Sequence, residues 1–253
     1  MVELFFVDAK FEGKITVSEK LKKFLGERKP KRIALFAAVQ FSQLDDFVQE
    51  VEKLKIKVLT TKAKRTAQPL QILGCDCYSD SFNEPIIDKA DMILYVGDGL
   101  FHPKALLLAQ IDKNNKNKTK EKMKPVVLYD PLSDSVKELS GEAIEKQLLR
   151  AKANVKKYLH AQHIGILVTI KPGQQYLYAA KQLKEKLAKD GKKGYIFIDN
   201  TFDLSALENY PFIDAWVNTA CPRIGTDDIV NINKPMINIR EAFDPIKALE
   251  MME

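Results

Sequence analysis

Short apolar segments that alternate with helix-like segments are the feature that most constrains the fold of this chain. In the first part of the sequence such segments occur at residues 4–7, 32–39, 56–61, 92–96 and 126–129, each bounded by polar or turn-forming residues. Their length and bounds are typical of buried β-strands. Between them lie helical patterns at residues 18–27 and 41–55, the second with apolar residues three and four apart. Strand, helix and strand in succession predict a parallel sheet.

A second series of the same kind follows a long helical pattern over residues 141–160. It comprises apolar segments at 163–170, 194–199, 215–220 and 235–239, with helical patterns over 174–189 and at the C-terminus. We therefore predict an α/β fold of two small doubly wound parallel-sheet domains with similar topology, residues 1–160 and 161–253. Ligands bind at the carboxyl ends of the strands in such sheets, so functional residues are expected directly after strands.

The composition describes a globular chain with a basic surface. Of the 253 residues 45% are hydrophobic, yet no apolar run approaches the roughly 20 residues that a membrane span needs, and the N-terminus does not resemble a signal peptide. We expect a cytoplasmic protein with no membrane contact. The net charge of +6 comes mainly from lysine, including the solvated loop 113–124. Because that loop has no interleaved aromatic residues for base stacking, direct nucleic-acid binding is not expected.

Three cysteines are the candidate metal ligands. Cys75 and Cys77 form a Cys-x-Cys pair, and Cys221 follows the predicted strand 215–220. An odd number of cysteines without an export signal argues against a disulfide framework. The spacing does not match a compact zinc motif, which supplies paired ligands at both ends. Buried thiols that act as small hydrophobic groups are the alternative interpretation.

Polar or tightly turned motifs follow several of the predicted strands. In the turn after strand 92–96, Gly97 and Gly99 allow the backbone to approach a ligand, and Asp98 could accept hydrogen bonds from a ribose or an amino group. His102 follows at a predicted helix start. An ordinary turn between a strand and a helix would also favour glycine and aspartate.

The turn after strand 163–170 has the sequence IKPGQ. Lys171 could pair with a carboxylate, and Gly173 could open a helix N-terminus that accepts an anion. A solvated lysine in a surface turn is the alternative.

Six short strings together resemble one family. They are QILGC (71–75), GDGLFHP (97–103), YDP (129–131), IKPGQ (170–174), PFIDAWV (211–217) and ACPR (220–223). Their order and spacing resemble those of the diphthamide synthase family over nearly the whole chain.

The resemblance implies a 4Fe-4S cluster held by three cysteines, one from each of three homologous domains, with S-adenosylmethionine at the fourth iron. Members transfer a 3-amino-3-carboxypropyl radical from S-adenosylmethionine to a histidine of translation elongation factor two, the first step of diphthamide synthesis. Thiolate ligation that leaves one iron open fits such chemistry.

By the same resemblance, Cys75 and Cys221 match the second and third cluster ligands, and residues 1–160 and 161–253 match the family's second and third domains. The residues that match turns of the cofactor cleft are Gly97, Asp98, Gly99, His102, Lys171, Gly173 and Gln174.

The sequence departs from the family pattern in three places. The family's first domain and its cysteine are expected to be absent, which leaves one cluster ligand missing. Cys77 is an additional cysteine, and Leu70 stands where glycine is usual before Gln71. If the segment around Cys75 is extended, residues i and i+2 point to the same side, so Cys77 could supply the missing ligand.

Three functions remain open at this point. The first is the larger piece of a split transferase, with a separate chain supplying the first domain and the third cysteine. The second is a non-catalytic or cluster-supporting subunit that pairs with a complete homologue. The third is an unrelated α/β nucleotide-binding enzyme whose cysteines are structural. The first is the leading interpretation, and retention of both cysteine motifs speaks against a bare scaffold.

Overall fold

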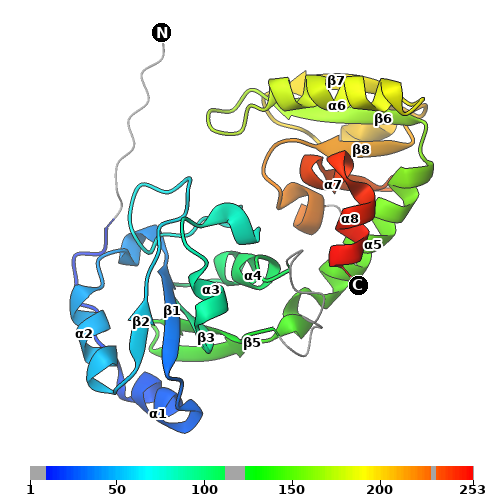
Figure 1. Cartoon of the computed structure of the whole chain (residues 1–253). Helices are drawn as coiled ribbons and strands as arrows, with labels where there is room; N and C mark the ends of the chain where they lie inside the picture. Colours follow the sequence, from blue (N-terminus) through cyan, green and yellow to red (C-terminus); the bar gives the residue numbers. More distant parts are fainter. Residues whose placement is uncertain (1–9, 112–122, 229–231, 253) are drawn as a thin grey trace. The chain divides into compact units, whose positions relative to one another are not determined.

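A computed structural model of the chain describes residues 10–111, 123–228 and 232–252. The strand expected at 4–7 and most of the lysine-rich segment 113–124 lie outside these ranges. The chain forms two compact units, residues 1–144 and 145–253 (Figure 1). The division therefore falls before the long helix α5 (Glu145–His160), whereas the sequence had suggested a boundary at its end. Helix α5 belongs to the second unit because its buried Val155 and Tyr158 pack in that unit's core.

The first unit is built on a five-stranded sheet with the order β2-β1-β3-β4-β5. Its strands are β1 (Arg32–Ala37), β2 (Lys57–Leu59), β3 (Met92–Val96), β4 (Val126–Asp130) and β5 (Ser135–Leu139). Its helices are α1 (Glu19–Arg28), α2 (Asp45–Lys53), α3 (Ile86–Lys89) and α4 (Phe101–Leu108). Strands β1 to β4 are parallel, and every residue of β3 is buried, as expected for a sheet covered on both faces.

Two local features of this unit differ from the sequence prediction. Strand β5 was not predicted; it pairs with β4 in antiparallel orientation, because a tight turn with Asp134 at φ 47° joins the two. The helix expected from residue 41 begins at Asp45, after a separate 3₁₀ turn over Val39–Phe41. Helix α1 is close to its predicted position: the Ser18 side chain accepts a hydrogen bond from Leu21 N at its start.

The second unit repeats this architecture with a four-stranded parallel sheet of order β7-β6-β8-β9. Its strands are β6 (His163–Thr169), β7 (Lys193–Asp199), β8 (Ala215–Asn218) and β9 (Met236–Asn238). Its helices besides α5 are α6 (Leu177–Lys189), α7 (Ile239–Phe243) and α8 (Pro245–Met251). Numbered within each unit, the parallel strands follow the order 2-1-3-4 in both sheets, which confirms the predicted α/β fold and its similar topology.

The sheet of the second unit has a core on each face because successive strand residues point to opposite sides. Ile164, Ile166 and Val168 pack with helices α5, α6 and α7. On the other face, Leu167 and Trp216 pack beneath the 3₁₀ segment Ser205–Asn209 and its flanking residues.

An aspartate just before the third strand secures the amino-terminal edge of each sheet. The Asp91 carboxylate accepts hydrogen bonds from the backbone N–H groups of Lys31 and Arg32, both at 2.8 Å. The Asp214 carboxylate accepts them from residues 162 and 163 at 2.9 and 2.8 Å. In each case the hydrogen bond from the first-strand residue, Arg32 or His163, is the main cause of a lowered carboxyl pKa. Because both units make this contact, their sequences can be aligned on it: Asp91 corresponds to Asp214.

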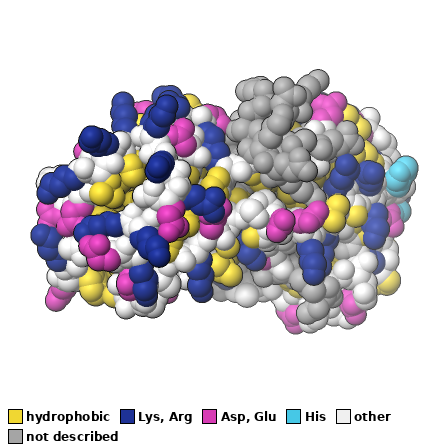
Figure 2. All heavy atoms as spheres, turned by 90° about the horizontal axis from the view of Figure 1, so that it is seen from below, with side chains coloured by type: hydrophobic (Ala, Val, Ile, Leu, Met, Phe, Trp, Pro, Cys, Tyr) yellow, Lys and Arg dark blue, Asp and Glu magenta, His cyan; other side chains and the backbone are white. Residues whose placement is uncertain are grey.

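Charged side chains of both signs are mixed on one face of the molecule. Figure 2 shows lysine and arginine interspersed with aspartate and glutamate on the face in view, without one dominant basic patch. Among the described residues no helix is long and apolar enough to span a bilayer.

Candidate functional site

Both sheets have a switch point at the carboxyl end of the first strand. The chain leaves β1 for β2 on one side and later returns to β3 on the other, and β6, β7 and β8 repeat the pattern. Loops diverge at such a point and leave room for a ligand between them. Gly97 follows β3 directly, Lys171 follows β6 after one residue, and Cys221 lies three residues beyond β8.

The loop that carries Cys75 reaches this edge of the first sheet by pairing with the end of β1. Ala37 N donates to Leu70 O at 2.9 Å, and Ile72 N donates to Ala37 O at 3.2 Å. Ala38 N in turn donates to Val96 O on β3. The Cys75 loop is therefore anchored to β1, on the side opposite β3, the strand that leads into the Gly97 turn.

Cys75 occupies a tight turn, not an extended segment. Asp76 N donates to Leu73 O at 2.9 Å, and Leu73 N donates to the Asp76 carboxylate at 2.8 Å. Cys75 is partly exposed, whereas Cys77 is buried. The extended geometry on which the same-side argument for Cys77 depended is wrong, because this reciprocal pair of hydrogen bonds closes the chain on itself.

Arg65 braces the same turn. Its Nη2 donates to Cys75 O at 3.1 Å, and its Nε lies 3.8 Å from the Asp76 carboxylate. Burial raises the pKa of the Asp76 carboxyl, and the hydrogen bond from Leu73 and the charge of Arg65 oppose that rise only in part. The Cys75 turn is thus held by a cation and a buried carboxyl group, neither of which the sequence motifs had indicated.

Glycines bring the Cys75 turn against the start of α4. A Cβ on Gly74 would overlap the ring of Phe101, so this close approach requires glycine. Gly99 has φ 66°, in the region that favours glycine, and a Cβ on Gly97 would lie 2.7 Å from the Tyr95 hydroxyl oxygen. The predicted Cys75 and Gly97–Gly99 elements therefore belong to one edge of the first unit.

His102 is positioned by a buried tyrosine. Its Nδ1 lies 3.2 Å from the Tyr95 hydroxyl, and the two rings are stacked with centroids 6.1 Å apart. Burial raises the pKa of the Tyr95 hydroxyl well above its ordinary value, and the exposed carboxylate of Asp98 adds to the rise. The hydroxyl is therefore neutral near pH 7 and can donate to Nδ1, which orients the imidazole.

Leu70 has a backbone conformation that explains why glycine is the expected residue there. Its φ of 63° lies in the left-handed region, which costs a branched side chain about 1 kcal/mol. Its side chain is buried, so apolar packing offsets that cost.

In the second unit, the turn after β6 is exposed and ordered by backbone contacts. Lys171 N donates to the Thr169 hydroxyl at 3.1 Å, and Gln174 N donates to Lys171 O at 3.1 Å. Gly173 adopts φ 76°, which this turn requires. The side chain of Lys171 is exposed at the carboxyl edge of β6. This turn follows the first strand of its unit, whereas the Gly97 turn follows the third, so the two turns are not equivalent in topology.

Cys221 is held by the side chain of Asn218, which is buried at the end of β8. Asn218 Nδ2 donates to Cys221 O and to Asn238 Oδ1, both at 2.8 Å, and its Oδ1 accepts from Ala220 N at 3.0 Å. Because a donor and two acceptors surround it, the orientation of this amide is fixed by its partners. Cys221 itself is partly exposed.

A buried ion pair supports the turn that follows Cys221. Arg223 directly precedes the π-helical turn Ile224–Asp228 and is only 2% exposed, and its Nε donates to the Asp227 carboxylate at 2.8 Å. Gln147 Nε2 donates to the other oxygen of that carboxylate at 2.6 Å. A Cβ on Gly225 would press on the Asn238 side chain, so glycine is needed here too. The asparagines at the ends of β8 and β9 were the sequence signal that could have revealed this network.

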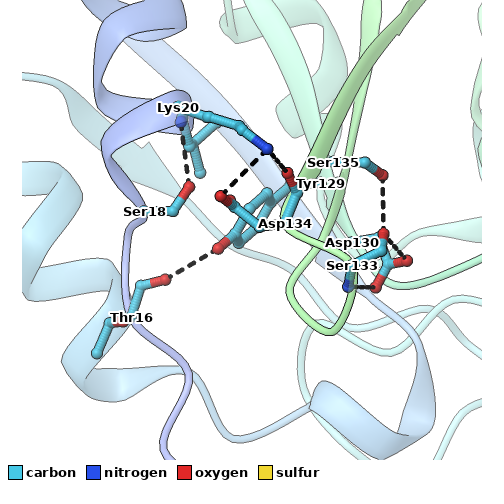
Figure 3. A network of polar contacts seen from close by, with 9 residues as sticks. Thr16, Ser18, Lys20, Tyr129, Asp130, Ser133, Asp134 and Ser135 are labelled. Atoms are coloured by element: carbon cyan, nitrogen blue, oxygen red, sulfur yellow. Dashed lines mark hydrogen bonds and ion pairs between the residues drawn. The ribbon is translucent and has the colours of Figure 1, made fainter.

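The YDP string has a structural role in the hairpin between β4 and β5. The Asp130 carboxylate accepts a hydrogen bond from Leu132 N at 2.9 Å. It also accepts one from the Ser133 hydroxyl at 2.5 Å (Figure 3). Burial opposes ionisation, but these hydrogen bonds outweigh it and lower the Asp130 pKa. The Tyr129 hydroxyl donates to Thr16 O at 3.3 Å. The motif therefore closes the turn between β4 and β5, and its tyrosine binds the segment that precedes α1.

Within each unit, then, the predicted residues gather at the carboxyl edge of the sheet. Cys75, the Gly97–Gly99 turn and His102 do so in the first unit, and Lys171–Gln174 and Cys221 do so in the second. Within the part of the chain that the structure describes, no group of three or more histidine, cysteine or carboxylate side chains forms a metal site.

The protein is of the α/β class. It has two units, and each unit has a parallel sheet of strand order 2-1-3-4 with a cysteine loop at the carboxyl edge. The family model described as "Putative diphthamide synthesis protein" matches residues 2–250, so the chain belongs to that family.

Two curated relatives and one solved structure agree. The 2-(3-amino-3-carboxypropyl)histidine synthase of Pyrococcus horikoshii is 30% identical over 233 residues, which cover 90% of this chain and 62% of that protein. Subunit 1 of the Schizosaccharomyces pombe synthase is 28% identical, covering 94% of this chain and 51% of the relative. The crystal structure of Dph2 from Pyrococcus horikoshii with a 4Fe-4S cluster superposes with a TM-score of 0.70 at 26% identity, covering 93% of this chain and 63% of that one. The chain thus spans about half to two thirds of these relatives' length.

Proposed function

We propose that this chain is part of a 2-(3-amino-3-carboxypropyl)histidine synthase. It would take part in transferring the 3-amino-3-carboxypropyl group of S-adenosylmethionine to a histidine of translation elongation factor two, the first step of diphthamide synthesis. The observation that carries this proposal is the family match over residues 2–250, together with two cysteines on loops at the carboxyl edges of the sheets.

Cys75 and Cys221 would be two ligands of a 4Fe-4S cluster. Cysteine thiolates are the usual ligands of such clusters, and a cluster with three thiolates offers its fourth iron to S-adenosylmethionine. Both side chains are partly exposed, and the backbone carbonyl of each is held, by Arg65 and by Asn218. Anchored backbones with accessible thiols fit the needs of a preformed cluster site.

The third thiolate would come from outside the two units, from the family's first domain or from a homologous subunit. Cys77 is the competing source within this sequence. Its side chain is buried, and the turn closed between Leu73 and Asp76 separates it from the partly exposed Cys75. These two features favour a third ligand from outside the two units over Cys77.

The glycine-rich turns would form parts of the S-adenosylmethionine site. Asp98 is exposed beside Gly97 and Gly99 and could accept hydrogen bonds from the amino group or the ribose. His102, oriented by Tyr95, could donate through its other ring nitrogen. In the second unit, Lys171 could pair with the carboxylate of the methionine portion, with Gly173 and Gln174 shaping the turn.

The experiment follows two labels of S-adenosylmethionine. Anaerobically reconstituted protein, with a family first-domain chain added, would be incubated with elongation factor two and a reductant. Label in the carboxyl group should reach the factor, whereas label in the methyl group should not, since only the aminocarboxypropyl group is transferred. A factor whose target histidine is replaced by alanine serves as the control.

Equal transfer of both labels, or transfer to the alanine variant of the factor, would contradict the proposal. Transfer that requires a complete homologue and survives replacement of both Cys75 and Cys221 would instead identify a supporting subunit. A failure of cluster assembly with the first-domain chain present would reject the ligand assignment.

A further inference from the structure

A pocket of about 400 Å³ lies at the amino-terminal edge of the first sheet, at the other end of the strands from Cys75. Its volume is within the range of roughly 300 to 1,000 Å³ that is usual for small-molecule sites. The lining comes from the end of helix α1, the segment that leads into β1, and the starts of β3 and β4. The charged side chains of this lining are Arg28, Lys29, Lys31 and Asp91.

Two of these four charges are already balanced within the first unit. The Arg28 guanidinium donates through Nη2 to the Glu138 carboxylate at 2.5 Å. The Asp91 carboxylate accepts the two backbone hydrogen bonds described above, and one of its oxygens lies 3.7 Å from the Arg32 guanidinium. The one acidic side chain of the lining is therefore not available to neutralise the two lysines.

Lys29 and Lys31 are the two unbalanced cations of the pocket. Both residues are exposed. Within the described part of the chain, no hydrogen bond or ion pair joins either ammonium group to another residue. Lys29 ends helix α1 in the left-handed conformation, with φ 47°, and its backbone N–H bonds to Leu25 O. The backbone at the lysines is thus fixed, by this bond and by the one from Lys31 N to Asp91, while both ammonium groups stay open to a ligand.

The second unit has the same edge without these cations. In both units the aspartate before the third strand accepts hydrogen bonds from the same two backbone positions, and this contact aligns the two sequences. The corresponding pairs are Arg28 and Leu159, Lys29 and His160, and Lys31 and Gln162. A sheet edge of this kind therefore folds without the three cations, so building the edge does not explain them.

The chemistry of the lining fits a phosphate monoester. Such a group carries about two negative charges near pH 7 and has three strong acceptor oxygens, which matches the two ammonium groups. Arg28 adds planar N–H donors, since Glu138 uses only its Nη2. A carboxylate or a phosphodiester carries a single charge and would leave one lysine unbalanced.

The rest of the lining can hold the organic part of such an ester. Pro30 and Met92 are buried, and Pro125 is partly buried, so the uncharged residues of the pocket are apolar. Apolar walls with a few convergent charged groups are the usual composition of small-molecule sites.

We propose that this pocket binds a phosphate monoester group, with Lys29 and Lys31 as its principal ligands and Arg28 as an additional donor. The inference follows from the pocket, its two unbalanced ammonium groups and the uncharged residues at the matching positions of the second unit. It does not depend on the chemistry proposed above.

The first test titrates the full chain with inorganic phosphate and with ribose 5-phosphate. At about pH 8 both probes carry close to two negative charges, and the ionic strength is held constant so that screening does not change. The amide chemical shifts of Lys31, Arg32 and Met92 should change saturably with both probes. Tighter binding of the sugar phosphate would support an organic monoester as the occupant, and equal binding would support free phosphate. Absence of a saturable change at these amides with either probe would overturn the proposal.

The second test gives the pocket the residues of the second unit. The double variant Lys29→His with Lys31→Gln should weaken binding of both probes by at least about tenfold, because two charge-assisted hydrogen bonds are lost. It should keep the wild-type melting temperature, since the hydrogen bond from the backbone N–H of residue 31 to Asp91 does not involve the replaced side chain.

A matched control removes the same charge elsewhere. Lys23 and Lys55 are exposed and lie outside the pocket lining, and Lys55, like Lys29, follows a helix with a positive φ, here 63°. The double variant Lys23→Gln with Lys55→His should bind both probes as the wild type does. An equal loss of affinity in the two double variants would show diffuse surface attraction and would overturn the proposal.

Dimethyl phosphate tests the class of the ligand. It is a singly charged diester, as is each link of a nucleic-acid backbone, and it should bind at least about tenfold more weakly than ribose 5-phosphate. Equal or tighter binding of the diester would overturn the assignment of a monoester. The same conclusion would follow if an RNA oligonucleotide or a glutamate-rich peptide shifted the amides of Lys31, Arg32 and Met92 while neither phosphate probe did.

Discussion

The two units have sheets of the same strand order, but they differ in how the chain brings a cysteine to the carboxyl edge of the sheet. In the second unit, β7 runs unbroken beside β6, and Cys221 follows the third strand. In the first, β2 pairs with only the first half of β1; the chain then departs and returns at Gln71 to pair with Ala37. That interrupted edge strand delivers Cys75. One topology thus brings a thiol to the carboxyl edge by two routes.

The shared register makes the contrast sharper. Counted from the matched residues Asp91 and Asp214, the position of Cys221 corresponds to Asp98, and that of Asn218 corresponds to Tyr95. Where the second unit has a cysteine held by a buried amide, the first has a carboxylate beside a buried tyrosine. Equivalent backbone positions at the carboxyl edge therefore have different side chains in the two units. The aspartate contact at the amino-terminal edge is the same in both.

The largest expected effect is the loss of cluster binding when either cysteine loop loses its thiol. Cys75→Ala and Cys221→Ala should each abolish stable binding of a reconstituted 4Fe-4S cluster, because each removes a direct iron ligand. Neither should change the melting temperature of the apoprotein by more than about 2 °C, since both thiols are partly exposed. Iron and sulfide content and the electron paramagnetic resonance of the reduced protein measure the loss.

Cys77→Ser is the matched control for this comparison. With a first-domain chain present it should retain the cluster. A 4Fe-4S signal that forms without any partner and disappears in Cys77→Ser would make Cys77 the third ligand and would show that the first unit supplies two thiolates.

A smaller effect tests whether the Cys221 loop depends on its buried amide. Asn218→Ala leaves Cys221 O, Ala220 N and Asn238 Oδ1 without their partner and should destabilise the fold by about 3 kcal/mol. Urea unfolding followed by Trp216 fluorescence reports on this unit. Asn200→Ala, at an exposed position after β7, should change stability by less than about 0.5 kcal/mol. Equal effects of the two variants would remove the special role of Asn218.

The shared edge predicts matched, pH-dependent effects. Asp91→Ala and Asp214→Ala should each cost about 1 kcal/mol at pH 7, a modest value because both carboxylates are partly solvent-exposed. The folded pKa of each carboxyl is lowered. The stabilisation is therefore complete above the unfolded pKa of about 3.9 and disappears as pH falls through the lower folded value.

Urea unfolding of wild type and both variants between pH 3 and 7 would check this, with differences that narrow toward the acid end. A pH-independent difference, or an effect in one unit only, would break the equivalence of the two edges.

The smallest effect concerns the position that corresponds to Asn218. Tyr95→Phe removes only the hydroxyl that meets His102 Nδ1 and should cost about 1 kcal/mol or less. The nitrogen-15 chemical shift of His102 Nδ1 should change in this variant, because this atom loses its hydrogen-bond donor. An unchanged Nδ1 shift would mean that Tyr95 does not orient the ring.

Much of the fold was visible in local patterns. Apolar segments at 92–96 and 163–170 predicted β3 and β6 almost to the residue, because strands buried on both faces need continuous apolar runs. The antiparallel strand β5 was missed because most of its residues are polar and none is buried, so its pairing with β4 depends on the turn and not on an apolar signature. The domain boundary was placed after α5 because a helix pattern does not show which core will bury its apolar face.

By itself the sequence determined which segments are strands and helices, which turns follow the strands, and which cysteines are candidate ligands, since these depend on residue type and spacing along the chain. Only the tertiary structure decided that Cys75 sits in a closed turn braced by Arg65 and Asp76, that Cys77 is buried, and that Asn218 holds Cys221. The physical reason is that these contacts join groups whose partners are selected by burial and hydrogen-bond geometry. An unpaired polar group in the interior costs more than any local preference can supply, and folding alone determines which groups meet.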